Sequence, residues 1–255
     1  MPIVNVENPS PPTAKPRKPR FAATVRQVQR LTPHLLRVTF AGPELAGFVW
    51  SGPAAHIKLF FDVNGAPVAR TYTPRRFDAA RGELDVDFVL HGVGPASDWA
   101  AQAAPGQSLQ IAGPGKGYAT DPDADWMLLA GDDTAIPAIA TLIEALPTTM
   151  PVTALVEIVE SADALPLAPA RPGLEVRWLV RGSDPAAAGR LLEAAVQEWV
   201  VPAGNGRIYV GCEADALRRI RRHLLQQRSL PVERVVTRGY WKLGATDHPD
   251  RDFGE

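Results

Sequence analysis

The chain has 255 residues and a net charge of −1, so it is long enough for two domains and carries no overall field that would attract nucleic acid. A single cysteine, Cys212, excludes an internal disulfide and any zinc or iron–sulfur site built on several cysteines. We find no apolar run near the roughly 20 residues of a membrane helix and no signal-peptide pattern. We therefore expect a cytoplasmic monomer that does not insert into a membrane.

The first 20 residues are interrupted by proline so often that they cannot hold a regular element. We expect a tail without secondary structure. Its basic residues between 15 and 20 leave contact with an acidic partner open, although a solvated tail is the simpler interpretation.

Between residues 21 and 122, six short runs read as strands, each bounded by Gly, Pro or Asn. The clearest is 84–90, in which apolar and mostly acidic residues alternate. The runs comprise residues 23–28, 35–40, 56–61, 69–73, 84–90 and 108–111. Six short strands without long helices between them predict a small antiparallel β-barrel.

Residues 70–75, Arg-Thr-Tyr-Thr-Pro-Arg, have a composition that suits a cofactor. Arg70 and Tyr72 would share one face of a strand, because side chains alternate with period two. Arginine binds phosphate through two hydrogen bonds and tyrosine stacks on flat rings, so the pair suits a cofactor with both a diphosphate and a ring. Taken alone, an ordinary strand rich in Thr and Tyr is the simpler interpretation.

The run ending at residue 90 is followed by His91, Gly92 and Gly94, and Pro95 then favours the start of a short helix. Such a turn directs backbone N–H groups toward an anion, which predicts a diphosphate site; a plain strand-to-helix turn is the alternative. His91 would either bond the phosphate or fill the turn. The glycine-rich stretch 113–118 matches no nucleotide fingerprint, and we interpret it as a structural turn.

From residue 123 onward, apolar runs alternate with helical patterns. The strands are expected at 126–130, 152–159, 174–180, 208–210 and 232–236, and the helices at 134–146, 186–199 and 215–226. This alternation predicts an α/β domain with a parallel sheet between residues 123 and 255.

Ligands of such sheets lie at the carboxyl ends of the strands, which directs attention to 131–135 and 211–213. Asp132 and Asp133 would be either an acid–base pair or acidic residues that favour a helix start. Cys212 is better explained as a small packed residue than as a nucleophile. Tyr240 and Trp241 follow the last expected strand and would either cover a flat cofactor or cap the domain interface.

In chain order, five stretches resemble the siderophore-interacting proteins, a family of flavin-dependent ferric-siderophore reductases with the ferredoxin-reductase fold. The resemblance covers roughly residues 20 to 255 and depends on residues 70–75, 91–99, 113–118, 131–139 and 239–242. It implies an FAD-binding barrel followed by a nicotinamide-nucleotide domain.

The resemblance also implies roles for individual residues. Arg70 would bind the diphosphate, with Tyr72 and Thr73 at the isoalloxazine. The other cofactor-binding residues that it implies are Asp87, His91, Gly92, Ala96 and Ser97 in the barrel and Asp132, Thr134, Tyr240 and Trp241 in the second domain.

Lys58 and Lys242 match the basic residues with which the family meets an anionic siderophore. A third basic residue that the resemblance leads us to expect near Gly131 is not apparent, because Asp132 and Asp133 follow that glycine.

The reaction implied by the resemblance passes electrons from NADH, NADPH or reduced ferredoxin through FAD to ferric iron, which leaves its siderophore as ferrous ion. The flavin would perform the chemistry, so no catalytic side chain and no metal-ligand set is expected of the protein. Two alternatives stay open: a general flavin-dependent electron-transfer reductase, and a flavoprotein that binds ferric siderophores without reducing them.

Overall fold

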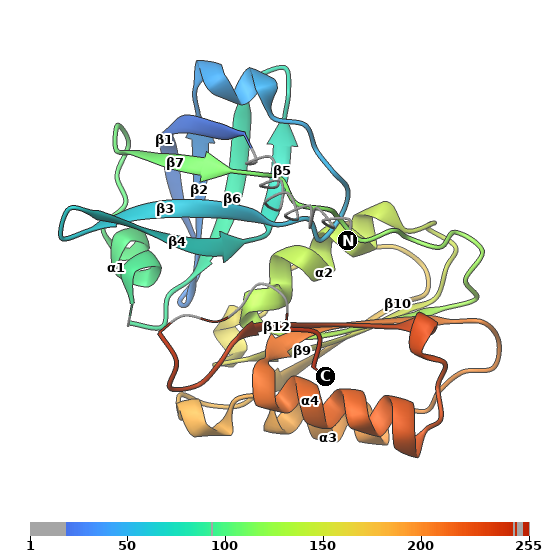
Figure 1. Ribbon diagram of the computed structural model, residues 1–255. Coiled ribbons are helices and arrows are strands. Elements are labelled where there is room, and N and C mark those ends of the chain that lie inside the picture. Colours follow the sequence, from blue (N-terminus) through green and yellow to red (C-terminus); the bar gives the residue numbers. More distant parts are fainter. Residues whose placement is uncertain (1–18, 93, 247, 249–251, 255) are drawn as a thin grey trace, which may run out of the picture.

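The computed structural model describes residues 19–92, 94–246, 248 and 252–254. These residues form two lobes, each built on one sheet: a seven-stranded antiparallel sheet above a five-stranded parallel sheet in Figure 1. Most of the expected N-terminal tail, residues 1–18, lies outside the described residues. No helix in the described part of the chain is both long and apolar enough to cross a bilayer.

The antiparallel sheet is curled and has the strand order β4-β3-β7-β1-β2-β6-β5. Its strands are β1 (Arg20–Thr32), β2 (Leu35–Ala41), β3 (Ile57–Val63), β4 (Ala66–Tyr72), β5 (Pro74–Asp78), β6 (Glu83–Val89) and β7 (Ser108–Ala112). A short 3-10 helix, η1 (Pro43–Gly47), follows β2.

The count of seven corrects the six strands expected from the sequence, and the additional strand is β5. Its proline and two arginines break the pattern of a strand. Pro74 is tolerated there because β5 is at the edge of the sheet and pairs only with β6.

The curled sheet remains open between β4 and β5, because these two strands do not pair with each other. The two strands are at opposite ends of the hydrogen-bonded order, although only Thr73 separates them in the chain. The sheet is therefore a half-barrel, and the end of β4 lies at its opening.

The interior of the half-barrel is filled by aromatic and aliphatic side chains from every strand. The short helix α1 (Pro95–Ala101), which begins at the proline as expected, closes one end. Its Trp99 ring lies 6.0, 5.5 and 5.6 Å from the rings of Phe40, Phe61 and Phe88. These contacts fix the connection between β6 and α1, where His91 and Gly92 lie.

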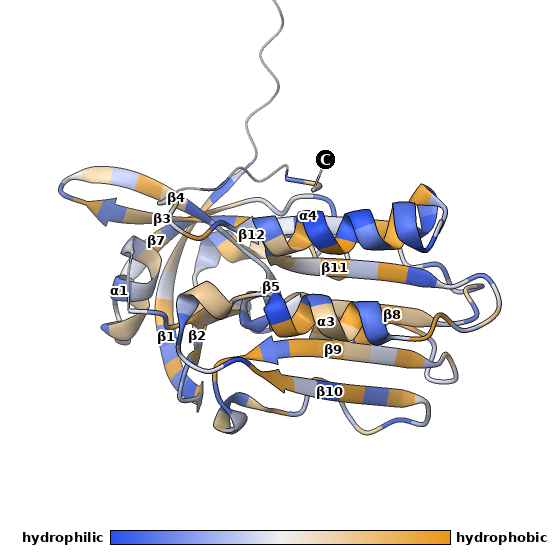
Figure 2. Ribbon diagram, turned by 90° about the horizontal axis from the view of Figure 1, so that it is seen from below, coloured by the Kyte–Doolittle hydropathy of each residue, from blue (hydrophilic) through white to orange (hydrophobic). Residues whose placement is uncertain are grey.

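The parallel sheet has the order β10-β9-β8-β11-β12. Its strands are β8 (Met127–Asp132), β9 (Val152–Ile158), β10 (Leu174–Val180), β11 (Arg207–Glu213) and β12 (Val235–Trp241). Helix α2 (Ile136–Ala145) covers one face, and α3 (Arg190–Glu198) and α4 (Ala214–Arg222) lie side by side on the other (Figures 1 and 2).

Short helical turns account for the differences from the expected helices. The 3-10 turn η2 (Asp133–Ala135) precedes α2, η3 (Ser161–Asp163) follows β9, η4 (Pro185–Ala187) precedes α3, and a π-helical turn (His223–Gln227) extends α4.

The last strand also differs from the expectation. Residues 232–236 were expected to form it, but η6 (Val232–Arg234) is a 3-10 turn and β12 begins at Val235. Gly239 weakens the strand pattern in the sequence, whereas pairing with β11 provides the hydrogen bonds that stabilise the strand. Tyr240 and Trp241 therefore lie on β12 itself and not after it.

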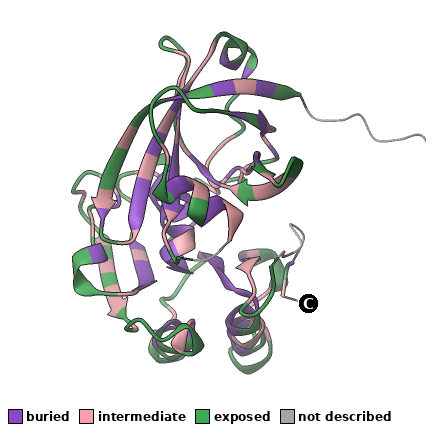
Figure 3. Ribbon diagram, turned by 90° about the vertical axis from the view of Figure 1, so that its left-hand side faces the viewer, coloured by how far each residue is buried: buried purple, intermediate pink, exposed green. Residues whose placement is uncertain are grey.

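Helix α2 is buried along most of its length between the two sheets (Figures 1 and 3). Polar contacts join it to the half-barrel: both guanidinium Nη atoms of Arg75 bond to Glu144, and the backbone N–H of Ala54 donates to Thr141. The two lobes are thus held in one arrangement, with the end of β4 facing the carboxyl ends of β8 and β12.

Candidate functional site

The end of β4 presents Arg70 and Tyr72 on one face of the sheet. Their Cα partners on β3 are Leu59 and Ile57, both buried in the half-barrel, so the expected shared face is observed. The ring of Tyr72 lies 4.6 Å from that of Phe88. Burial raises the pKa of the Tyr72 phenol far above its ordinary value, although Arg70 opposes the shift. The phenol is therefore neutral at physiological pH and keeps a proton to donate.

The guanidinium of Arg70 reaches the segment that follows β12. Its Nη2 donates to the backbone carbonyl of Thr246 at 2.7 Å, and its Nη1 to the carbonyl of Ala69 at 2.8 Å. A cationic group at the opening of the half-barrel is thus bonded to carbonyl oxygens, which an anionic ligand can replace.

Thr73 lies next to Tyr240, where the two lobes meet. It is buried directly after β4, and its interaction with the Tyr240 hydroxyl opposes the rise that burial causes in the pKa of that phenol. That hydroxyl lies 2.7 Å from the hydroxyl of Tyr209 on β11. A methyl group added at Gly211 would lie 3.2 Å from Cζ of Tyr240, so a side chain at residue 211 would crowd the ring. Sequence reasoning missed Tyr209; its only signal is a phenol inside an apolar strand, where it needs a partner.

Asp132, at the end of β8, accepts hydrogen bonds from three other elements. Its Oδ1 accepts from the backbone N–H and the hydroxyl of Thr134, and its Oδ2 from the N–H of Glu213 at 2.9 Å and the indole Nε1 of Trp241 at 2.8 Å. Burial, followed by the charge of Asp133, raises the pKa of Asp132 to about 6. This carboxylate holds the ends of β8, β11 and β12 together and fixes the Trp241 indole.

The structure does not support Asp132 and Asp133 as an acid–base pair that shares a substrate. Asp133 is bonded instead to Arg181, with 2.7 Å between Oδ2 and Nη2. Arg181 follows β10, two strands away from β8, so no local pattern could have revealed it. The structure thereby places a basic residue beside the Gly131 turn, where the sequence showed none.

The connection between β6 and α1 gathers the residues expected to bind a diphosphate. The backbone N–H groups of His91 and Gly92 donate to the Ser97 hydroxyl at 3.2 and 3.3 Å. Ser97 and Ala96 are buried in the first turn of α1. Burial lowers the pKa of His91, which favours the neutral imidazole.

Asp87, which the resemblance assigns to cofactor binding, forms an ion pair with Arg37. Both of its oxygens are bonded to Arg37, at 2.7 Å from Nε and 2.9 Å from Nη2, on the side of β6 away from the buried Phe88. The geometry makes Asp87 part of an ion pair between β2 and β6.

The two lysines expected to meet a siderophore contact different parts of the structure. Lys58 is the Cα partner of Thr71, so it lies on the sheet face opposite to Arg70, with Nζ 3.4 Å from the Thr71 hydroxyl. Lys242 follows Trp241 directly, and its Nζ lies 3.2 Å from Asp215. Hydrogen bonding to Lys242 contributes most to lowering the pKa of Asp215.

A cavity of about 430 Å³ opens at the carboxyl end of β11, between the N-terminal ends of α3 and α4. Its charged lining residues are Arg190, Arg219, Glu193, Glu213 and Asp215. The Arg219 Nε lies 2.6 Å from Glu193, which neutralises part of its charge. Sequence reasoning did not single out either arginine.

Cys212 is fully buried, as its interpretation as a packed residue requires. Burial raises the pKa of its thiol well above the ordinary value, so the thiol stays protonated and unreactive.

Comparisons with known proteins match both lobes. The family model described as siderophore-interacting FAD-binding domain matches residues 24–69 and 62–118, and the model described as siderophore-interacting protein matches residues 124–244. Ferric vibriobactin reductase ViuB of Vibrio cholerae is 31% identical over 251 residues, which cover 90% of this chain and 91% of ViuB.

Solved structures agree with this assignment. A siderophore utilization protein from T. fusca superposes with a TM-score of 0.83 at 37% identity, covering 91% of this chain and 96% of that protein. A ferredoxin NADP+ reductase from Neisseria gonorrhoeae superposes with a TM-score of 0.65 at 15% identity, covering 87% of this chain and 99% of that protein. The latter likeness confirms the ferredoxin-reductase-like fold. The matched family models, the identity to ViuB and the shared fold together show that the chain belongs to the siderophore-interacting protein family.

Proposed function

We propose that the chain is an FAD-dependent reductase that transfers electrons to the iron of ferric siderophores. The observation that supports this best is the 2.7 Å hydrogen bond from Nη2 of Arg70 to the carbonyl of Thr246, in the segment that follows β12. It brings the Arg70-Tyr72-Thr73 end of the half-barrel against the aromatic end of β12, so phosphate-binding and ring-binding groups converge on one opening. The Vibrio cholerae relative, which is named a ferric vibriobactin reductase, supports the same reaction class.

The residues at this opening fit FAD. A diphosphate needs cationic and neutral donors: Arg70 would provide the charge, and the Ser97 hydroxyl, which accepts from the N–H groups of His91 and Gly92, keeps its own hydrogen to donate. Gly92 and Gly94 have φ of 74° and 97°, and a Cβ at either would have no atom within 4 Å, which leaves room for a ligand. Tyr72, supported by Phe88, offers a flat surface for a ring.

When bound, FAD would supply the conversion of a two-electron hydride transfer into single-electron steps. The protein's own groups bind and orient. Arg70 would neutralise the diphosphate, and Thr73 would hold the ring edge through its hydroxyl, which Tyr240 and Tyr209 orient. Asp132 holds the indole of Trp241 at the end of β12.

For the electron donor we propose a nicotinamide nucleotide in preference to ferredoxin. The cavity at the carboxyl end of β11 supports this choice, because it is large enough for part of a nucleotide and lies where parallel sheets bind such ligands. Arg190 and Arg219 would meet phosphate, and Asp215 would accept a hydrogen bond from ribose.

Anaerobic single-turnover spectroscopy of the purified protein tests this function. We expect a yellow protein that releases FAD, is bleached by NADH or NADPH, and recovers its colour when a ferric siderophore is added. A colourless protein that cannot be reconstituted with FAD would contradict the proposal. Bleaching without recovery would favour a general electron-transfer reductase, and siderophore binding without either step would favour a binding protein.

A further inference from the structure

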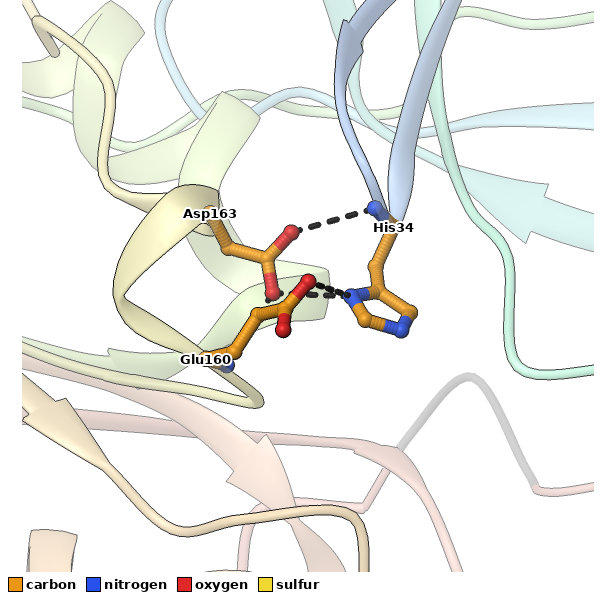
Figure 4. A group of neighbouring side chains, drawn as sticks. All are labelled: His34, Glu160 and Asp163. Carbon is orange, nitrogen blue, oxygen red and sulfur yellow. Dashed lines mark hydrogen bonds and ion pairs between the residues drawn. The ribbon is translucent and has the colours of Figure 1, made fainter.

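His34, Glu160 and Asp163 form a cluster where the two lobes touch (Figure 4). His34 lies in the turn between β1 and β2, whereas Glu160 precedes η3 and Asp163 ends it. The Nδ1 atom of His34 is 2.9 Å from Oδ2 of Asp163 and 3.8 Å from Oε1 of Glu160. One ligand atom of each residue lies within 4.8 Å of the other two.

The carboxylate of Asp163 is held firmly in place. Its side chain is only 5% exposed. Its Oδ1 accepts from the Thr32 hydroxyl at 2.9 Å and from the backbone N–H of His34 at 3.0 Å, and its Oδ2 from the N–H of Glu160 at 3.2 Å. Because these donors fix both oxygens, Oδ2 is directed at the imidazole without needing a bound ion. Hydrogen bonds of this kind orient the ligands of protein metal sites.

The other two side chains give access from solvent. Glu160 is half exposed and His34 about one third exposed, with fractions of 50% and 34%. An ion can therefore reach the cluster, and water can complete its coordination.

We propose that His34, Glu160 and Asp163 bind one divalent first-row transition cation, such as Zn²⁺, through Nδ1, Oε1 and Oδ2. Bonds of about 2.0–2.2 Å at tetrahedral angles place ligand atoms about 3.4 Å apart, between the two separations observed here. An imidazole with two carboxylates favours zinc and its neighbours over calcium or magnesium, which prefer oxygen alone. The cation replaces the Nδ1 proton and balances the two carboxylate charges.

The ion would connect the two lobes. Thr32 and His34 belong to the half-barrel, and Glu160 and Asp163 to the lobe of the parallel sheet. The neighbouring Leu35 is already buried in the core of that second lobe, so the ligand atoms meet without a rearrangement. A bound cation should therefore stabilise the folded chain, and this holds whether or not the proposed reductase activity is correct.

Titration of the full, tag-free chain with Zn²⁺ by calorimetry, and with Co²⁺ by visible absorption, tests the site. We expect one equivalent to bind at this site. Glu160→Gln, which changes a half-exposed side chain, should weaken Zn²⁺ binding at least about tenfold, and His34→Ala should weaken it further. Glu198→Gln, an exposed carboxylate on α3, is the matched control and should bind as the unchanged chain does.

Thermal unfolding gives a second measurement. Zn²⁺ should raise the unfolding temperature of the unchanged chain and of Glu198→Gln, but not of His34→Ala. Should His34→Ala fail to fold, the comparison of Glu160→Gln with Glu198→Gln decides the question. Equal Zn²⁺ affinity in all variants, no binding by the unchanged chain, or equally tight binding of Ca²⁺ or Mg²⁺ would each overturn the proposal.

Discussion

Arg70 is the single residue on which we expect FAD affinity to depend most. Its guanidinium lies at the opening of the half-barrel and bonds to carbonyl oxygens that a diphosphate can replace. Arg70→Ala should weaken FAD binding by about 10- to 100-fold, which corresponds to about 1.5–3 kcal/mol for hydrogen bonds to a charged group. Fluorescence titration of the flavin-free protein measures the change. Arg177→Ala, an exposed arginine on β10, is the control, and an equal loss in both variants would contradict the assignment.

Asp132 should make stability depend on pH. Its pKa in the folded chain is raised from 3.8 to about 6, so between these values the folded state binds more protons than the unfolded state. The contribution of this group to stability is therefore fully present below about pH 4 and is lost as the pH rises through about 6.

Urea unfolding of the unchanged chain and of Asp132→Asn from pH 4 to 8 measures this contribution. The free energy of unfolding of the unchanged chain, relative to the variant, should fall by on the order of 1–3 kcal/mol between pH 4 and 7 and then level off. A difference that rises with pH would show that the ionised form is the stabilising one.

At the scale of secondary-structure elements, the Arg171 side chain caps the C-terminal end of α2. Its Nη1 donates to the carbonyls of Ile143 and Leu146, and its Nη2 to those of Pro147 and Met150 at 2.6 and 2.7 Å. The last carbonyls of a helix have no partner within the helix, so one guanidinium here satisfies two at the helix end and two in the turn that follows. This contact fixes α2 between the two sheets.

Arg171→Met should lower the free energy of unfolding by about 2–4 kcal/mol, because half-buried carbonyls lose a charged donor. Denaturant unfolding measures the loss, and Arg177→Met is the control at an exposed position of β10. A change below about 0.5 kcal/mol, the usual size for a surface substitution, would mean that water replaces the guanidinium at no cost.

At the scale of the whole molecule, a net charge of −1 provides no field that would guide an anionic ferric siderophore. Local positive charge would have to attract the siderophore, and we propose that Lys58 and Lys242 provide it. Replacing both with Ala should slow single-turnover reoxidation of the reduced flavin, more at low salt than at high salt, without changing flavin content.

The single variants refine this prediction. Lys242 adjoins Trp241, whereas Lys58 lies on the sheet face opposite to Arg70, so we expect Lys242→Ala to have the larger effect. Lys116→Ala removes an exposed charge elsewhere and should leave the rate unchanged. If the double variant reoxidises at the unchanged rate in low salt, the siderophore docks at another surface.

The sequence alone determined the division into an antiparallel half and a parallel α/β half, the start of α1 at Pro95, and the bounds of β10. It also showed the resemblance to the family and the shared face of Arg70 and Tyr72. These features follow from local periodicity, from glycine and proline, and from short motifs, all of which act within a few residues.

Only the tertiary structure decided which groups meet. Trp241 reaches Asp132 across 109 residues, and Arg181 reaches Asp133 across 48. Neighbouring strands also decide two features of the sheets. Pro74 is tolerated because β5 lies at a sheet edge, and β12 extends to Trp241 because it pairs with β11. Residues so far apart in the chain become hydrogen-bond partners because the two sheets pack around α2. The periodicity of a single segment contains no information about that packing.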